Sequence, residues 1–174
     1  MHRGPALSAT MLLLVSLACS NEISPPGVGG PGPYPSCLSQ GEIDLVTIIQ
    51  QARADSGRPP LVVDTRLIQA ARLNTSRLRD ATATDSVEFG GTYGISGEYV
   101  DFGFGFSSAS DLYSEWLSSP NSARQFGFGI LLGPTGRLFG VSRDTTVATT
   151  ASPRWSIVVS TSTATPVTNG SCTP

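Results

Sequence analysis

The apolar and polar positions predict an amphipathic helix near the start of the folded region. Residues 39–42 (SQGE) have the form of a capping box, in which Ser39 and Glu42 satisfy free backbone N–H groups at the helix start. Gly57, followed by Pro59 and Pro60, ends this helix, because these residue types do not continue it. Apolar side chains recur between these limits at helical spacing: Leu45, Ile48, Ile49 and Ala52.

A second helix is predicted from Thr65 to about Arg79, with Asp64 as its N-cap. Its apolar face carries Leu67, Ile68, Ala71 and Leu78. Asn74 falls on the same face, so we expect this side chain to be partly buried and to need hydrogen-bond partners.

A loop, a strand and a third helix are predicted next. Residues 80–95 are polar and glycine-rich, which is typical of a loop. In a predicted strand over residues 98–106, three phenylalanines alternate with glycines and would share one face: Phe102, Phe104 and Phe106. We expect this stripe to pack in the core; the alternative is a lining for a lipid or aromatic pocket. A helix is predicted over residues 108–118, with Leu112 and Trp116 inward and Pro120 after its end.

The last part of the domain is predicted to be an antiparallel meander. Strands are expected over residues 126–132 and 137–141, joined by a hairpin turn, and again over residues 155–160. Residues beyond Thr161 are rich in threonine and are predicted to be loose, apart from Cys172. This order of helices followed by strands predicts the α+β class.

The N-terminus has the pattern of an export signal. His2 and Arg3 give a short positive region, and residues 11–17 are apolar. An apolar stretch this short does not span a bilayer as a helix, so residues 1–18 are predicted to be a cleaved signal peptide.

The end of this signal resembles the lipobox of bacterial lipoproteins, in which a small residue precedes a cysteine that receives the lipid. Ala18 precedes Cys19 here, although Ser16 stands where the pattern usually has leucine. The resemblance implies a membrane anchor through lipid on Cys19; the alternative is an ordinary signal peptide in which Cys19 is incidental. Residues 19–37 are dominated by proline and glycine and are predicted to be a tether.

Two cysteines remain once Cys19 is assigned to lipid. Cys37 and Cys172 flank the predicted domain, residues 38–163, and its tail, residues 164–174. In an oxidising envelope they are predicted to form a disulfide, because the two ends of a domain usually lie close together. The alternative is two free thiols on frayed ends.

Composition excludes several kinds of chemistry. The net charge of -2 provides no basic field for nucleic acid, and the absence of lysine excludes a P-loop or a Schiff-base enzyme. His2 is the only histidine. A mature chain without it has no imidazole for a Ser–His or Cys–His pair or for the usual zinc site, so we expect no metal and no cofactor.

Four segments resemble, in order, the SCP/YkwD-like bacterial branch of the CAP superfamily. Residues 48–61 (IIQQARADSGRPPL) are similar to the family's opening motif, with Gln50 where the family usually has asparagine. Residues 64–78 are similar to D-x-x-L-x-x-A-A, residues 97–99 (GEY) to G-E-N, and residues 116–122 (WLSSPNS) to W-x-x-S-P-G-H. The resemblance implies a three-layer α-β-α sandwich with an antiparallel sheet and a shallow cleft.

The family's cleft typically carries two histidines and one or two glutamates, and in some members it binds a divalent metal. Here that cleft is degenerate, because residues 79–96 contain no histidine and Ser122 stands at the second histidine position. Glu98 keeps the glutamate of G-E-N, whereas Tyr99 replaces its asparagine and Ser119 is the nearest counterpart of the second glutamate. Metal binding by imidazole is therefore not expected.

The candidate cleft residues are Glu98, Tyr99, Asn74, Ser119 and Ser122. Glu98 would accept hydrogen bonds from a ligand or act as a general acid or base; the alternative is a carboxylate that bonds backbone amides and holds its loop. Ser119 and Ser122 have no base to activate them and are typical of helix ends and turns.

Together these patterns indicate an exported, lipid-anchored envelope protein. Its CAP-like domain is expected to be a non-catalytic binding or structural module, with the membrane and an envelope ligand or protein as its partners. The alternative is a weak, metal-independent hydrolase that acts on an envelope substrate through Glu98.

Overall fold

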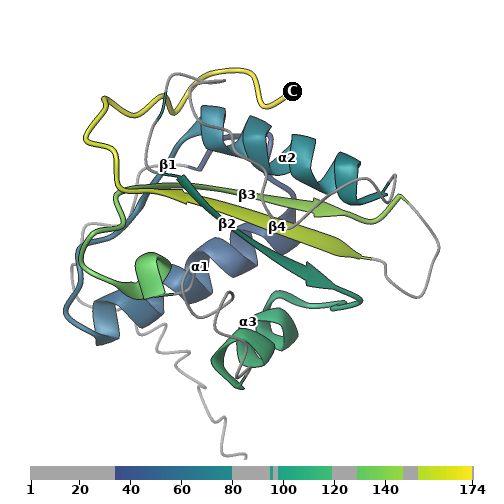
Figure 1. The fold of residues 1–174 in the computed structure, drawn as a ribbon, viewed down its shortest axis with the longest axis horizontal. Helices are drawn as coiled ribbons and strands as arrows, with labels where there is room; N and C mark the ends of the chain where they lie inside the picture. The colour runs from purple at the N-terminus through teal and green to yellow at the C-terminus, as the bar shows by residue number, and fades with distance from the viewer. Residues whose placement is uncertain (1–33, 80–94, 96–97, 119–128, 147–152, 174) are drawn as a thin grey trace, which may run out of the picture.

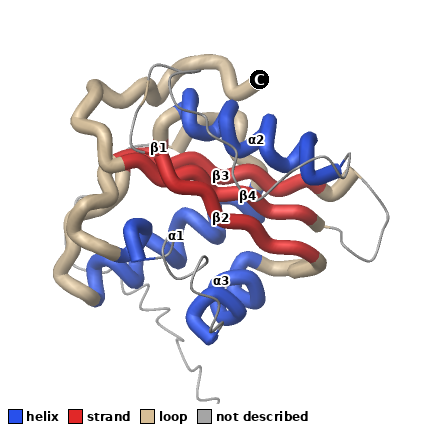
Figure 2. The backbone as a smooth tube through the Cα atoms, in the orientation of Figure 1, coloured by secondary structure: helices blue, strands red, loops and turns tan. Residues whose placement is uncertain are grey.

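The computed structural model describes residues 34–79, 95, 98–118, 129–146 and 153–173 of the chain. In this part, helix α2 covers one face of a four-stranded sheet, and helices α1 and α3 lie against the other face (Figures 1 and 2). The predicted three-layer α-β-α sandwich is confirmed. The predicted signal peptide and Cys19 lie outside the described residues.

The three predicted helices begin and end close to their expected positions: α1 Gln40–Asp55, α2 Thr65–Arg79 and α3 Ala109–Ser118. The capping box of α1 is confirmed, since the Glu42 carboxylate accepts hydrogen bonds from the Ser39 backbone N and Oγ at 2.6 and 2.8 Å. Asp64 caps α2 by accepting a hydrogen bond of 2.9 Å from the backbone N of Arg66.

The sheet is mixed rather than wholly antiparallel. Its strands are β1 Val62–Val63, β2 Glu98–Phe104, β3 Leu138–Asp144 and β4 Arg154–Ser160, in the order β1-β3-β4-β2. The pairs β3–β4 and β4–β2 are antiparallel, as predicted, but β1 runs parallel to β3. Two residues are too few to show an alternating pattern, so the sequence alone does not predict a strand at this position.

The predicted hairpin before β3 is wrong. Residues 129–132 are helical, and β3 pairs with β4 and β1 rather than with the segment before it. A short apolar run is compatible with either a strand or a buried helical turn. Here the turn is favoured because Arg53 of α1 donates through Nη1 to the carbonyl oxygens of Leu131 and Gly133, which a helix end leaves free.

The phenylalanine stripe is also different from the prediction. Gly105 has a φ of 77° and turns the chain just after β2, so Phe106 does not continue the strand. Phe106 packs against the core on the side of α1 and α3, whereas Phe104 is 39% exposed. The stripe is therefore neither one face of a strand nor wholly part of the core.

Hydrophobic cores lie on both faces of the sheet. The larger one fills the space between the sheet and the helices α1 and α3, and includes Leu45, Ile49, Leu112, Phe139 and Trp155. The smaller one lies beneath α2 and includes Leu67, Ala70, Ala71, Leu138 and Val158.

Gly140 of β3 sets the distance between α2 and the sheet. A Cβ atom at this position would lie 2.1 Å from the carbonyl carbon of Leu67 and 2.2 Å from the backbone N of Ile68. Real Cβ atoms do not approach backbone so closely, so α2 rests on the sheet where glycine leaves room.

The C-terminal tail is held rather than loose. Residues 165–172, which we call the C-terminal strap, run along α2. The strap forms hydrogen bonds with the N-cap of α2 and with four residues of the helix. These residues are Asp64, Thr65, Arg66, Gln69 and Arg72. The predicted disulfide is confirmed: Cys37 and Cys172 are bonded, with 6.2 Å between their Cα atoms.

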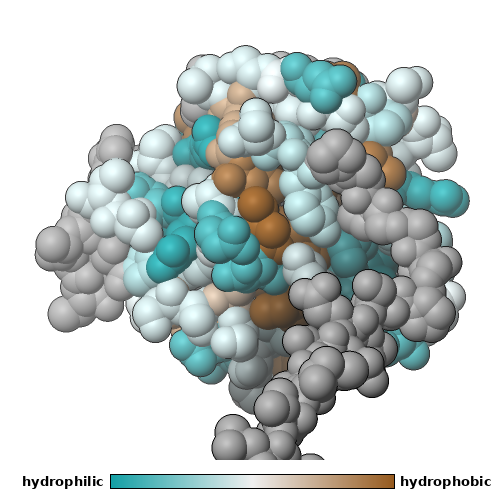
Figure 3. Space-filling view, turned by 180° about the vertical axis from the view of Figure 1, so that it is seen from behind, coloured by the Kyte–Doolittle hydropathy of each residue, from teal (hydrophilic) through white to brown (hydrophobic). Residues whose placement is uncertain are grey.

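The face of the molecule opposite to that in Figure 1 shows many hydrophilic side chains (Figure 3). Seen from behind, hydrophobic side chains form a narrow band between hydrophilic groups (Figure 3). Within the described part of the chain, no helix is long and apolar enough to span a membrane.

We predict that Gly140→Ala lowers the free energy of unfolding by about 3 kcal/mol, because the added methyl group pushes α2 away from the sheet. Urea unfolding followed by circular dichroism measures the change. Gly129→Ala is the matched control, since a Cβ atom there meets nothing within 4 Å and its stability should not fall. Equal losses in the two variants would contradict the close contact.

We also predict that reduction of the Cys37–Cys172 bond lowers the free energy of unfolding by about 4 kcal/mol, because the bond restrains a long loop in the unfolded chain. The measurement is urea unfolding with and without reductant. The double variant Cys37→Ser, Cys172→Ser should be equally destabilised and insensitive to reductant. A reductant effect that persists in this variant would refute the assignment.

Candidate functional site

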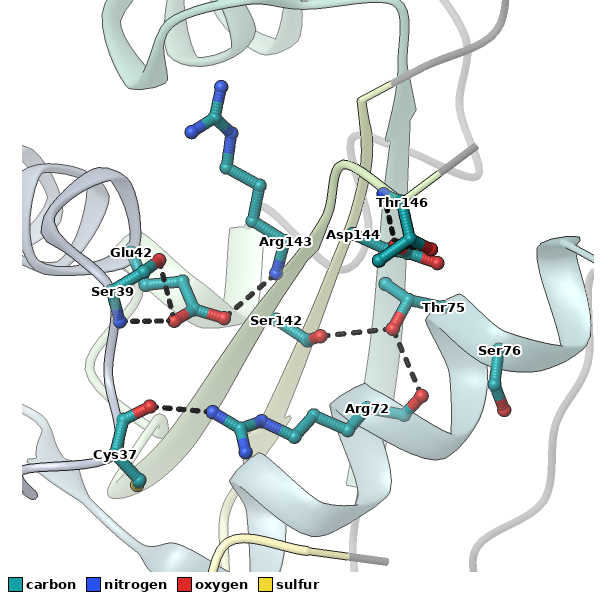
Figure 4. Close-up of a pocket in the computed structure, with 10 residues that line it drawn as sticks. All are labelled: Cys37, Ser39, Glu42, Arg72, Thr75, Ser76, Ser142, Arg143, Asp144 and Thr146. Carbon is teal, nitrogen blue, oxygen red and sulfur yellow. Dashed lines mark hydrogen bonds between the residues drawn. The ribbon is translucent and has the colours of Figure 1, made fainter. Parts of the chain in front are cut away.

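A pocket of about 380 Å³ opens between the start of α1, the second half of α2 and the end of β3 (Figure 4). The residues that line it are mostly of polar type and come from segments far apart in the sequence. The lining residues are Cys37, Ser39, Glu42, Arg72, Thr75, Ser76, Ser142, Arg143, Asp144 and Thr146.

Glu42 completes the exposed edge of the sheet inside this pocket. Strand β1 pairs only with the first two residues of β3, so the rest of that edge has no neighbouring strand. Glu42 is 3% exposed, and its Oε1 accepts a hydrogen bond of 2.9 Å from the backbone N of Arg143. The same carboxylate therefore caps α1 and occupies a backbone donor of β3.

The other polar side chains of the pocket also bond to the protein itself. Arg72 donates to the carbonyl oxygens of both disulfide cysteines, at 2.6 Å to Cys37 and 3.1 Å to Cys172. The hydroxyls of Thr75 and Ser142 lie 2.9 Å apart and point toward each other (Figure 4). These groups are occupied in joining α1, α2 and β3, which makes this pocket a structural junction.

Arg143 turns its guanidinium group away from the pocket (Figure 4). The group lies 5.1 Å from the centre of the Trp155 ring, and Nη2 donates to the carbonyl oxygen of Ser107 at 2.8 Å. Its position fixes the segment before α3 against the sheet, with a contribution from the attraction between cation and ring.

The first family-like segment is structural as well. The side-chain amide of Gln50 bonds both the backbone N and the carbonyl oxygen of Leu61, at 3.0 and 2.6 Å. Arg53 is fully buried and also donates to the carbonyl oxygen of Pro59 at 2.8 Å. Burial, and then the nearby charge of Arg58, lower the pKa of Arg53 from its ordinary value.

Most of the buried hydrogen-bonding atoms that have no partner among the described residues lie between α2 and the sheet; Nε of Arg143, on the opposite face, is the exception. Asn74 is fully buried, and neither its Oδ1 nor its Nδ2 has a hydrogen-bond partner among the described residues. The same holds for Oγ of the fully buried Ser156 and for the buried Nη1 of Arg154, a residue that is 8% exposed. We call Asn74, Ser156 and Arg154 the polar triad. Buried polar atoms are nearly always bonded, so three such residues under one helix mark a candidate binding site.

The structure treats the sequence-predicted site residues in different ways. Asn74 is buried, as predicted, but the partners that the prediction called for are absent from the described residues. Glu98 and Tyr99 begin β2, opposite Ser160 and Val159 of β4, and their side chains lie outside the description. Ser119 and Ser122 belong to a segment outside the described residues.

Sequence reasoning missed the two members of the triad on β4. A signal was present, because Arg154 and Ser156 alternate with Trp155 and Ile157, as in a strand with one polar face.

The triad does not fit the divalent metal that some CAP domains bind. A guanidinium group repels a cation, and an amide and a hydroxyl are neutral, so they provide none of the anionic ligands that such metals need. Among the residues that the structure describes, no three His, Cys, Asp or Glu side chains are grouped to hold an ion.

No family model and no curated protein sequence matches the chain. Among solved structures, the Schistosoma mansoni venom allergen-like protein 4 is similar with a TM-score of 0.53 and 12% identity, over 77% of this chain and 96% of that one. An outer surface protein of Borrelia burgdorferi is similar with a TM-score of 0.52 and 16% identity, over 67% of this chain and 88% of that one.

A cysteine-rich secretory protein of Staphylococcus aureus gives a TM-score of 0.48 and 15% identity over 70% of this chain, which spans 38% of that protein. At these identities the likenesses concern the fold alone. With its three layers and mixed four-stranded sheet, the chain has the α+β fold of CAP-type structures.

Proposed function

We propose that this chain is an exported, lipid-anchored protein of the cell envelope, and that its CAP-type domain is a non-catalytic module that binds a ligand. The Cys37–Cys172 disulfide supports export, because such bonds persist in oxidising compartments. The outer surface protein of Borrelia burgdorferi, whose fold is similar, agrees with this location.

The polar triad is the observation that carries the binding role. In the folded protein, Asn74, Ser156 and Arg154 have polar atoms without hydrogen-bond partners among the described residues. The polar groups of the neighbouring pocket, in contrast, form hydrogen bonds within the protein. Unused donors in a buried place are costly to the free protein, and a ligand that satisfies them recovers that cost on binding.

Cys19→Ser is expected to move the protein from the membrane fraction to the soluble fraction of the envelope, because the variant has no thiol for the lipid. Intact mass of the wild-type protein should show a lipid adduct on Cys19. The double variant Cys37→Ser, Cys172→Ser is the matched control and should stay in the membrane fraction. A wild-type protein that starts after another cleavage site and carries no lipid would refute the anchor.

Glu98→Gln distinguishes binding from hydrolysis. If the domain only binds, purified protein leaves envelope glycans, peptides and lipids chemically unchanged, and this variant behaves like the wild type. Mass spectrometry of the incubated fractions measures turnover. Turnover by the wild type that is lost in Glu98→Gln would replace the binding role by a hydrolase.

A further inference from the structure

We propose that the polar triad binds the oxyanion group, carboxylate or phosphate, of a small acidic ligand. This inference rests on the proposed binding function and names its ligand class.

The triad lies between α2 and the sheet. Asn74 belongs to α2, and Arg154 and Ser156 belong to the face of β4 that α2 covers. Along β4, Arg154 and Ser156 alternate with Trp155 and Ile157, and the latter two belong to the core on the opposite side. Val158, which shares the face of Ser156, packs in the core beneath α2. Because α2 packs against both β3 and β4, Asn74 is buried between helix and sheet.

A neighbouring hydrogen bond places the triad more closely. Ser142 of β3 stands directly opposite Ser156 of β4, and its hydroxyl bonds Thr75, the residue next to Asn74 on α2. Residues opposite each other in a sheet point to the same side. The Thr75–Ser142 pair lines the pocket described above, whereas Ser156 and Asn74 do not, so this pair separates the pocket from the triad.

Arg154 forms no ion pair with a described residue. Asp144 stands opposite it on β3, but Oδ1 of that carboxylate accepts hydrogen bonds of 2.8 and 2.6 Å from Thr146. Among the described residues, the single ion pair joins Arg66 to Asp64. Arg154 as a residue is 8% exposed and its Nη1 is buried, and burial of part of a guanidinium group without an anion is costly.

The chemistry of the triad selects the ligand. Nη1 of Arg154 and Nδ2 of Asn74 only donate hydrogen bonds, and Ser156 provides a hydroxyl. A set dominated by donors, with one positive charge, is complementary to an oxyanion, since guanidinium binds carboxylate and phosphate through charge-assisted hydrogen bonds. Oδ1 of Asn74 then accepts a hydrogen bond from a hydroxyl or N–H on the same ligand.

Ser156 and Ser142 provide a matched test of whether the Ser156 hydroxyl lacks a hydrogen-bond partner. Ser156→Ala removes a buried hydroxyl that has no partner and should raise the melting temperature by about 3 °C. Ser142→Ala is the same change on the same face of the next strand, but it breaks the bond to Thr75 and should lower the melting temperature. A Ser156→Ala variant that melts as low as Ser142→Ala would show that Ser156 is satisfied, by ordered water for example, and would overturn the proposal.

The probes for the oxyanion are acetate, lactate and inorganic phosphate, each titrated into the exported, disulfide-bonded protein at constant ionic strength against chloride. At ten times its dissociation constant, a bound probe should raise the melting temperature by about 4 °C. Response to acetate and lactate alone assigns a carboxylate, and response to phosphate alone assigns a phosphate ester; either supports an oxyanion site.

Arg154→Met and Asn74→Leu should remove most of this probe-dependent shift, whereas Ser142→Ala should keep it. Asn74→Leu provides a second reading if Arg154→Met does not fold. The proposal would be overturned if no probe raised the melting temperature of the wild type. It would also be overturned if both triad variants kept the wild-type shift, because the probe would then bind as an adventitious ion only. Anchoring is tested separately by Cys19→Ser, so failure of one result leaves the other intact.

Discussion

The position of every residue beneath α2 depends on the contact between this helix and Gly140. At this point the backbone of α2 contacts the sheet directly, and the Cβ atom of any other residue at position 140 would overlap with the carbonyl carbon of Leu67. Because the helix cannot lift without losing the packing of the smaller core, the contact fixes where the polar side chains of its second half lie. Thr75 is thereby placed above Ser142, and Asn74 is closed in with no partner.

Polar groups on the two sides of α2 have opposite roles. On the outer side, Arg66, Gln69 and Arg72 bind carbonyl oxygens of the C-terminal strap and replace the water that would otherwise solvate them. On the inner side, the polar triad is removed from water without such replacement. Natural proteins retain costly features of this kind mainly where function requires them, which is why the inner side is the place to look for a ligand.

The helices were predictable because their signals are local. Capping residues such as Ser39 and Asp64, together with apolar spacing, depend on neighbours a few positions away. Strand β1 and the helical turn at residues 129–132 were not predictable, since each is decided by a distant partner: β3 in the first case and Arg53 in the second. The strap was missed for the same reason, because its bonds come from the polar face of α2, a pattern typical of a solvated surface.

The candidate site was predictable only in part. Asn74 was identified because an amide on an apolar helix face is unusual. Arg154 and Ser156 were not, because their surroundings depend on how β4 lies under α2, which no local pattern states.

The proposed anchor at Cys19 gives the position of Cys37 a mechanical consequence. A pull on the chain before Cys37 reaches the disulfide before it reaches α1, which begins at Gln40. Part of that load passes through Cys172 into the strap and is shared among its hydrogen bonds to α2 and the N-cap, while Arg72 links both cysteine carbonyls to the same helix. Tension on the N-terminal side of Cys37 is thus transmitted to α2 as well as to α1, so it does not act on the first turn of α1 alone.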